Sequence, residues 1–429
     1  MKNEGKIIVG IDIGTSKIVT VIARVDENVS VLGVSEVRAN GIRKGQIVDI
    51  EEAVASINNS LEGAERMAGY SASHVVASIG GGHIESLNQT GVVAVSNPDG
   101  EITQNDLLRV IDAAKAVSLP SSREIIHVLP RNYSVDGQEG IKDPIGMSGI
   151  RLEVDTHIIS ANTTAIRNLE KALSNVGVDV DGVIFTGYAS SLSVLSETEK
   201  ELGVILVDIG AGTTDISIYV EGSVAYSSVL AIGARHITND LAIGLRISLE
   251  SAEKIKLFLS NPLKAIKISE EEESDSKQKN PDEIDLSSLH LAEDLSKVSR
   301  KTLVDGIIRP RLNEIFTFIG IELKKSGFGG QTPSGLVVTG GGALTVGIID
   351  SAKRTLAMPV RVGLPTNLKG IIDEIQTPAF STVVGLAVYG ATLEAETNLP
   401  FGISVPQIPN LKLNKIFSKV INIIKSFIP

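Results

Sequence analysis

The feature that most constrains the fold is a pattern of two β-strands and a glycine turn that occurs twice along the chain. The first copy covers 6–23 (KIIVGIDIGTSKIVTVIA) and the second covers 203–219 (GVILVDIGAGTTDISIY). Each copy turns at Asp-Ile-Gly between two β-branched runs, which is typical of a β-hairpin. The two aspartates, Asp12 and Asp208, lie 196 residues apart in a chain of 429. We therefore expect two related lobes that open with the same hairpin.

Both turns are suited to bind an anion together with a cation. Glycine has no Cβ, so turns that contain Gly14, Gly210 and Gly212 let backbone N–H groups approach phosphate oxygens. Asp12 and Asp208 at the strand ends are expected to hold a hydrated Mg²⁺, which takes one or two carboxylates besides phosphate and water. Further donors to the anion are expected from Thr15, Ser16, Lys17, Thr213 and Thr214.

Composition excludes several other kinds of site. The chain has no cysteine, which excludes disulfides, thiolate metal sites and a cysteine nucleophile. Its six histidines lack paired ligand spacing, so we interpret them as ordinary core or surface residues. A net charge of −11 argues against nucleic acid as the main partner. The N-terminal apolar run is broken by Asp12 and glycines, which argues against a signal peptide, and no apolar stretch is long enough to span a bilayer.

The pattern along the chain predicts an interrupted first lobe. Helical periodicity is expected over 51–68, 104–117, 162–176 and 294–325, and the short strand patterns within 83–160 predict a small α+β insertion. The acidic stretch 268–295 is expected to be a solvated loop or partly disordered. The expected domains are 1–82 with 161–197 (first-lobe core), 83–160 (insertion), 198–245 with 311–396 (second-lobe core), 246–310 (outer subdomain), 397–410 (proline-containing linker) and 411–429 (terminal helix).

The last segment, 411–429 (LKLNKIFSKVINIIKSFIP), predicts a basic amphipathic helix. Its large apolar residues recur at helical spacing, its polar face carries four lysines, and no acidic residue follows Glu396. Such a helix suits the surface of an anionic membrane, in which its apolar face can be buried. The alternative is a terminal helix that packs on the protein's own core.

Three motifs carry a resemblance to known proteins. IVGIDIGTSKI, ILVDIGAGTTDISI and LVVTGGGALTVG resemble the phosphate-1, phosphate-2 and adenosine motifs of the superfamily that contains actin, sugar kinases and DnaK-type chaperones. The resemblance implies an α/β, two-lobed actin-like ATPase fold with ribonuclease H-like lobes, which binds ATP and Mg²⁺. It also implies residues near the adenosine or the α-phosphate: Glu253, Lys256, Gly340, Gly341, Gly342 and Ala343.

Within this superfamily the chain resembles the bacterial division proteins of the FtsA family. The resemblance rests on GIRKGQIVDI at 41–50, the insertion at 83–160 (an SHS2 domain in that family), and the linker with its amphipathic tail. It implies a protein that polymerises with itself on the cytoplasmic face of the membrane at the division site. It further implies anchoring of the FtsZ ring, contact with later division proteins, and binding of the FtsZ C-terminal tail near Arg300, Lys301 and Arg309.

Hydrolysis of ATP is expected to be slow at most. Members of the superfamily that hydrolyse ATP place a carboxylate or carboxamide near the γ-phosphate, whereas the corresponding segment here, 184–191 (IFTGYASS), has Thr186 instead. Asp208 or Asp215 can polarise water through Mg²⁺. Two alternatives stay open: a small-molecule kinase of the same fold, and a pilus assembly protein similar to PilM.

Overall fold

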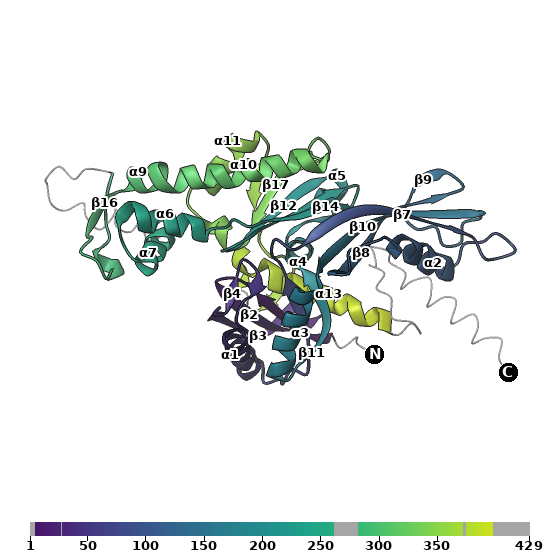
Figure 1. Ribbon diagram of the computed structural model, residues 1–429, viewed down its shortest axis with the longest axis horizontal. Coiled ribbons are helices and arrows are strands. Elements are labelled where there is room, and N and C mark those ends of the chain that lie inside the picture. The colour runs from purple at the N-terminus through teal and green to yellow at the C-terminus, as the bar shows by residue number, and fades with distance from the viewer. Residues whose placement is uncertain (1–4, 27, 261–281, 372–374, 398–429) are drawn as a thin grey trace.

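The computed structural model describes residues 5–26, 28–260, 282–371 and 375–397. Two mixed sheets with the same topology form the centres of two lobes (Figure 1). The first has the strand order β11-β6-β1-β2-β3-β19, and the second has the order β14-β13-β12-β17-β18. In each sheet an antiparallel hairpin (β1–β2, β12–β13) continues into an antiparallel third strand and pairs on its other side with a parallel strand. The prediction of two related lobes that open with the same hairpin is confirmed.

The strands of the first sheet are β1 (Lys6–Ile13), β2 (Lys17–Val25), β3 (Val29–Arg38), β6 (His74–Ile79), β11 (Asp179–Phe185) and β19 (Leu368–Gly370). Those of the second are β12 (Val204–Ile209), β13 (Thr214–Val220), β14 (Ser223–Leu230), β17 (Leu336–Thr339) and β18 (Val360–Val362). Small two-stranded sheets are formed by β4 (Ile42–Arg43) with β5 (Gln46–Ile47) and by β15 (Glu283–Asp285) with β16 (Lys297–Ser299).

Helices cover the sheets and separate the lobes. The helices outside the insertion are α1 (Ile50–Ala68), α3 (Thr163–Val176), α4 (Thr186–Val194), α5 (Glu197–Leu202), α6 (Arg235–Leu245), α7 (Leu249–Ser260), α9 (Arg300–Leu303), α10 (Arg309–Ser326), α11 (Ile348–Leu356) and α13 (Ser381–Thr397). Short 3₁₀ segments are η1 (Ser287–Leu289), η3 (Gly341–Leu344) and η4 (Pro378–Phe380), and η2 (Val304–Ile308) is a π-helical turn. Helices α4 and α13 pack on each other, α13 against β1 and α4 against β12, so they lie between the two sheets.

Helix α1 illustrates how the sequence sets these elements. Asp49 accepts a hydrogen bond from the backbone N–H of Glu52 and so caps the first turn, while Gly69 ends the helix in the left-handed conformation. Between the caps the apolar residues recur at helical spacing and are buried against β2 and β3. The helix predicted over 51–68 is therefore confirmed with nearly the predicted bounds.

The inserted segment forms its own antiparallel sheet with the order β7-β10-β8-β9. Its elements are β7 (Glu85–Ala94), α2 (Gln104–Lys115), β8 (Arg123–Val135), β9 (Gln138–Ile141) and β10 (Arg151–Asn162). Helix α2 packs on β7 and β10 over a separate small apolar core, and Figure 1 shows this sheet extending away from both lobes. The α+β insertion in the first lobe is thus present, while the exact domain boundaries stay predictions.

The insertion meets the second lobe where two edge strands approach each other. Ser86 Oγ on β7 donates to the carbonyl oxygen of Ser227 on β14 at 2.7 Å, and Asn88 Nδ2 donates to that of Ala225 at 3.1 Å. His157 on β10 lies 2.7 Å from Asn88 Oδ1 and 3.0 Å from Ser227 Oγ. Side chains thereby satisfy backbone groups of β14 that an unprotected edge would expose.

Two expectations for the second lobe need correction. The helix predicted over 294–325 begins only at Arg300, because 297–299 pairs as β16 with β15 and Ser299 caps the helix that follows. The acidic stretch is ordered in its described part: Leu286, next to β15, is fully buried in the core of the second lobe. The rest of that stretch, the linker beyond Thr397 and the terminal segment 411–429 lie outside the described residues. Among the helices that the structure describes, none is long and apolar enough to cross a membrane.

The close packing of α13 on α4 depends on Gly385. A Cβ at this position of α13 would lie 1.8 Å from the backbone oxygen of Ala189 on α4, so only glycine lets the two helices approach this closely. We expect Gly385→Ala to lower the free energy of unfolding by about 1–3 kcal/mol through overpacking. The matched control is Gly306→Ala, since Gly306 has open space around it. Thermal unfolding of both variants checks this, and equal melting temperatures would contradict the packing argument.

Candidate functional site

The two glycine turns lie against each other where the two lobes meet. They close in the same way, by a hydrogen bond from Gly14 N–H to Lys17 C=O at 3.1 Å and from Gly210 N–H to Thr213 C=O at 2.9 Å. A Cβ on Gly212 would lie 2.9 Å from the side chain of Thr15, so the two turns touch without room for a larger residue. Two backbone turns of the kind that can bind an anion are thus brought together where the lobes meet.

Asp12 is the acidic group of the first turn. It lies next to the last residue of β1, and its Oδ1 accepts a hydrogen bond of 2.7 Å from Ser78 Oγ on the parallel strand β6. Ser78 Oγ in turn accepts from the backbone N–H of Ile13 at 2.9 Å, which fixes the hydroxyl. Burial raises the pKa of Asp12, and the hydrogen bond from Ser78 and the charge of Lys17 act in the opposite direction.

Asp208 is the corresponding group of the second turn, and it is buried. Its Oδ2 accepts hydrogen bonds from Ser190 Oγ on α4 at 2.5 Å and from Thr382 Oγ1 on α13 at 3.2 Å. Burial raises its pKa to about 6; the hydrogen bond from Ser190 opposes this shift, whereas the negative charge of Asp12 adds to it. The two helices between the lobes therefore hold this carboxylate in place.

Asp215 is a third acid that the register of the second hairpin places opposite Asp208. It is buried, and its Oδ1 has no hydrogen-bond partner among the described residues. Burial raises its pKa well above the usual range, and the charges of Asp208 and Asp12 raise it further. The charge of Asp12 raises the pKa of both Asp208 and Asp215, and one buried oxygen of Asp215 has no partner among the described residues, so this environment favours a cation.

Thr186 faces Asp215 from the first lobe. Its hydroxyl donates to the carbonyl oxygen of Ile79 at 3.0 Å. A Cβ on Gly80 would lie 2.7 Å from Thr186 Oγ1 and 3.7 Å from Asp215 Oδ1, so the backbone at Gly80 borders this part of the cleft. Thr186, which occupies the position where the resemblance implies a carboxylate or carboxamide, is thus near Asp215.

The remaining predicted donors are engaged in different ways. Ser16 is exposed at the turn, and Thr15 Oγ1 accepts a hydrogen bond from Gly45 N–H at 3.0 Å. Thr213 is buried in the second turn. The hydroxyl of Thr214 donates to the carbonyl oxygen of Ile232 at 2.8 Å, inside the second lobe. Lys17 lies beside Glu36, with 2.6 Å between Nζ and Oε2.

The predicted adenosine residues lie on two elements of the second lobe. Gly340 follows β17 with a φ of +80°, and a Cβ there would lie 2.1 Å from Asp208 Oδ1, so a side chain is excluded. Gly341, Gly342 and Ala343 begin η3. On α7, Lys256 Nζ lies 2.7 Å from Glu253 Oε2 and 2.9 Å from Thr238 Oγ1.

A magnesium ion fits the carboxylates of the cleft. Within the described ranges, no group of three or more histidine or acidic side chains is placed to hold a metal ion. Mg²⁺ does not require such a group, because it usually keeps water and takes one or two carboxylates besides phosphate oxygens. Asp12 and Asp208 are the predicted ligands, and the unpartnered oxygen of Asp215 is consistent with a cation nearby.

Sequence reasoning missed the groups that support the acids. Ser78, Ser190 and Thr382 hold the carboxylates of Asp12 and Asp208, and each is a small polar residue within an otherwise apolar or glycine-rich run. The three glycines at 80–82 were also missed. They follow β6, which pairs in parallel with β1. In the same way, the glycines at 340–342 follow β17, which pairs in parallel with β12. This second duplicated turn was a signal that the sequence contained.

Comparisons with known proteins agree with this architecture. Residues 81–160 match the model of the SHS2 domain inserted in FtsA, and 205–385 match that of the cell division protein FtsA. The chain is 39% identical over 394 residues to the cell division protein FtsA of Pseudomonas aeruginosa, with 91% of each chain covered.

Solved structures with the same fold have low sequence identity. The PilM-PilN type IV pilus biogenesis complex is 16% identical, covers 90% of this chain and 98% of its own, and has a TM-score of 0.62. MreB5 of Spiroplasma citri bound to ADP is 14% identical, covers 92% and 99%, and has a TM-score of 0.52. The predicted two-lobed actin-like fold is confirmed.

The raised pKa of Asp208 predicts a pH-dependent stability. The pKa of Asp208 is about 6 in the folded protein, against about 3.9 in an unfolded chain. Between these two pH values the folded state therefore binds more protons than the unfolded state. The free energy of unfolding should therefore fall by roughly 3 kcal/mol as pH rises through this window. We expect Asp208→Asn to remove this loss. Thermal unfolding of the nucleotide-free protein should show the variant more stable than the parent at pH 7.5 and similar at pH 4; a difference independent of pH would contradict this cause.

Proposed function

This chain belongs to the FtsA family of cell division proteins, and we propose that it binds ATP with Mg²⁺ in the cleft and tethers division filaments to the membrane. The observation that carries the nucleotide site is the meeting of Asp12, Asp208 and Asp215 at two facing glycine turns, with Asp215 Oδ1 buried and unpartnered. An anion alone would be repelled by these acids. A triphosphate with a divalent cation satisfies both the carboxylates and the backbone turns.

In this proposal each lobe contributes one side of the nucleotide site. The turn with Gly14, Thr15 and Ser16 and the turn with Gly210, Gly212 and Thr213 hold the phosphates. Gly340 to Ala343 approach the adenosine and the α-phosphate, where the excluded side chain at Gly340 leaves the backbone accessible. Glu253 and Lys256, already paired on α7, flank the adenosine. Solved MreB5 structures of the same fold hold ADP or AMPPNP, which supports this choice of ligand.

Slow hydrolysis follows from what lies beside Asp215. Mg²⁺, when bound, supplies charge neutralisation for the phosphates and polarises water. The Thr186 hydroxyl donates a hydrogen bond to the carbonyl oxygen of Ile79 and is a poor base, so Asp208 or Asp215 is left to accept a proton or orient water there. The protein accordingly acts as a nucleotide-dependent assembly protein, at most with slow ATPase activity.

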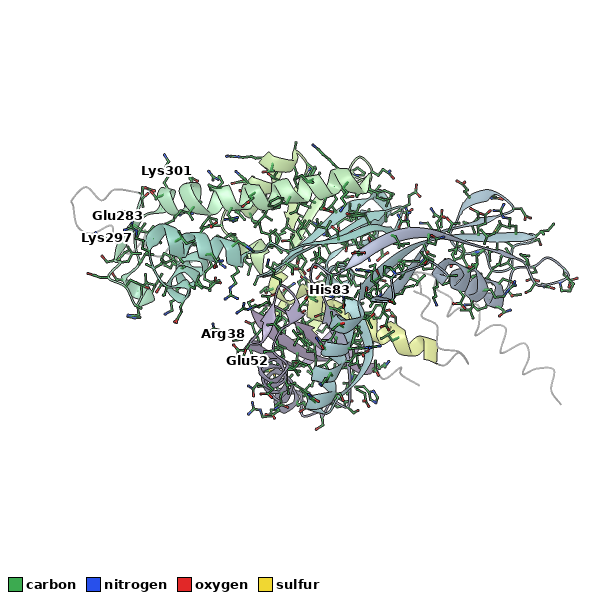
Figure 2. The ribbon with its side chains drawn as sticks, in the orientation of Figure 1. Arg38, Glu52, His83, Glu283, Lys297 and Lys301 are labelled. Atoms are coloured by element: carbon green, nitrogen blue, oxygen red, sulfur yellow. The ribbon has the colours of Figure 1, made fainter. Side chains whose placement is uncertain are left out.

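The tethering role combines three surfaces. Segment 411–429, outside the described residues, binds anionic lipid on the cytoplasmic face of the membrane at the division site. Figure 2 shows Lys301 at the outer end of the second lobe, beside Glu283 and Lys297. Lys297 begins β16, which pairs with β15 and leads directly into α9. This surface, with Arg300 and Arg309, binds the FtsZ tail. The inserted sheet at 83–160 contacts the next copy in a filament and later division proteins.

Two other functions are less well supported. A small-molecule kinase requires a carboxylate base beside its acceptor hydroxyl, and 184–191 contains none. A pilus assembly role would rest on the likeness to PilM, which at 16% identity concerns the fold. Family membership, by contrast, rests on relatives that this chain matches along 91% of its length.

The nucleotide site is tested by Asp208→Ala. Removing one proposed Mg²⁺ ligand should abolish Mg²⁺-dependent ATP binding, because the phosphates would then face Asp12 and Asp215 with the cation poorly held. Calorimetric titration with ATP, with and without Mg²⁺, measures this. Asp181→Ala, an exposed acid in the first lobe that pairs with His74, is the control and should bind normally. Undiminished affinity of Asp208→Ala would exclude the proposed role.

The membrane tether is tested by changing its apolar and its basic face separately. Ile424→Glu places a charge in the apolar face and should nearly abolish vesicle binding. Changing Lys415 and Lys419 to Gln removes about 2 kcal/mol of electrostatic attraction, so binding should weaken on anionic vesicles and change little on neutral ones. Vesicle flotation against the parent measures both. If Ile424→Glu floats like the parent but loses thermal stability, the segment is a core element and no tether.

A further inference from the structure

Lys17 is placed between a carboxylate, an aromatic ring and the cleft. Its Nζ lies 2.6 Å from Glu36 Oε2 and 4.2 Å from the centre of the Phe380 ring. Its charge also reaches the cleft, since it opposes the effect of burial on the pKa of Asp12 and Asp208. The ammonium group that is predicted to bind phosphate is therefore already paired in the folded protein.

The register between β2 and β3 explains this pair. Lys17 at the start of β2 lies opposite Arg38 on β3, and the next residue on the same face, Val19, lies opposite Glu36. Lys17 and Glu36 are thus diagonal neighbours, within reach of long side chains.

Phe380 holds the other side of the ammonium group. It ends η4, and the preceding Pro378 accepts a hydrogen bond from Gly340 N–H at 3.1 Å, so the ring belongs to the segment that supports the adenosine turn. A cation over a ring face is stabilised without a competing hydrogen bond. Lys17 can therefore stay over the ring while its charged donors exchange one oxygen partner for another.

We propose that Glu36 is a positioning residue that holds Lys17 in the nucleotide-free cleft and competes with the nucleotide phosphates for it. This inference rests on the proposed nucleotide site and deepens it. Glu36 is about half exposed, with 48% of its side chain accessible, while Lys17 is 22% accessible. The pair is therefore weak enough for a multiply charged phosphate to displace the carboxylate. Because Glu36 competes only with ligands that use Lys17, it lowers the affinity for phosphate-bearing ligands and leaves that for ligands without phosphate unchanged.

The test is ATP binding by Glu36→Gln, measured by calorimetric titration with Mg²⁺. Releasing Lys17 should tighten ATP binding about two- to fivefold, the range of an exposed ion pair. Binding of adenosine, which has no phosphate, should not change. The gain should shrink at high ionic strength, because salt screens exposed charges. Glu36→Asp, which retains the charge on a shorter side chain, should give an affinity between those of the parent and Glu36→Gln.

A double-mutant cycle separates competition from simple charge repulsion. In the Lys17→Gln background, Glu36→Gln should leave ATP affinity unchanged, because the residue for which it competes is absent. Glu52→Gln is the control for net charge, since Glu52 is an exposed acid of the same lobe on the first turn of α1 (Figure 2). This control should bind ATP like the parent.

The outcomes distinguish this inference from the proposed site. Equal tightening by Glu36→Gln with and without Lys17 would mean general repulsion and overturn the competition. No tightening in the parent background would overturn it as well. Failure of the parent itself to bind ATP would overturn the nucleotide site, and the inference with it. Unchanged adenosine binding in Glu36→Gln verifies that the cleft is intact.

Discussion

The cleft depends on the cost of placing three carboxylates near one another away from water. Asp208 and Asp215 are buried, and the charges of Asp12 and Asp208 raise the pKa of Asp215 further. Such groups cost free energy unless they are hydrogen-bonded, protonated or paired with a cation. The structure supplies hydrogen bonds to two of the three and leaves Asp215 Oδ1 without one. Positive charge near this oxygen would therefore lower the cost of burying the carboxylates.

The two helices between the lobes supply the hydrogen bonds that the buried carboxylate of Asp208 requires. Helix α4 brings Ser190 and α13 brings Thr382 to the same oxygen of Asp208, and the two hydroxyls also lie 3.0 Å apart. Both donors reach the carboxylate only if the helices pack closely, which the absence of a side chain at Gly385 allows. Packing between the lobes and electrostatics in the cleft are thus two aspects of one arrangement.

The duplicated hairpin was predictable because its signal is local: two β-branched runs around Asp-Ile-Gly. Its register then placed Asp12 and Asp208 at equivalent strand ends. The supporting hydroxyls were not predictable, since Ser190 and Thr382 reach Asp208 across 18 and 174 residues, and no periodicity encodes such contacts. The onset of the helix at Arg300 was misjudged because Ser299 acts as a cap only once β15 and β16 have paired.

The two lobes share a topology, yet the cleft they form is asymmetric, and the asymmetry arises at single positions of the shared hairpin. Opposite Asp12 the first hairpin has Val19, whereas opposite Asp208 the second has Asp215. Lysine follows the first turn, where Lys17 pairs with Glu36, and the small Thr213 and Thr214 occupy the second. One lobe therefore carries the lysine, and the other carries the additional acid. In the proposed function these unlike groups come together only when the lobes meet, so the duplicated fold would build one site from two halves rather than two equivalent sites.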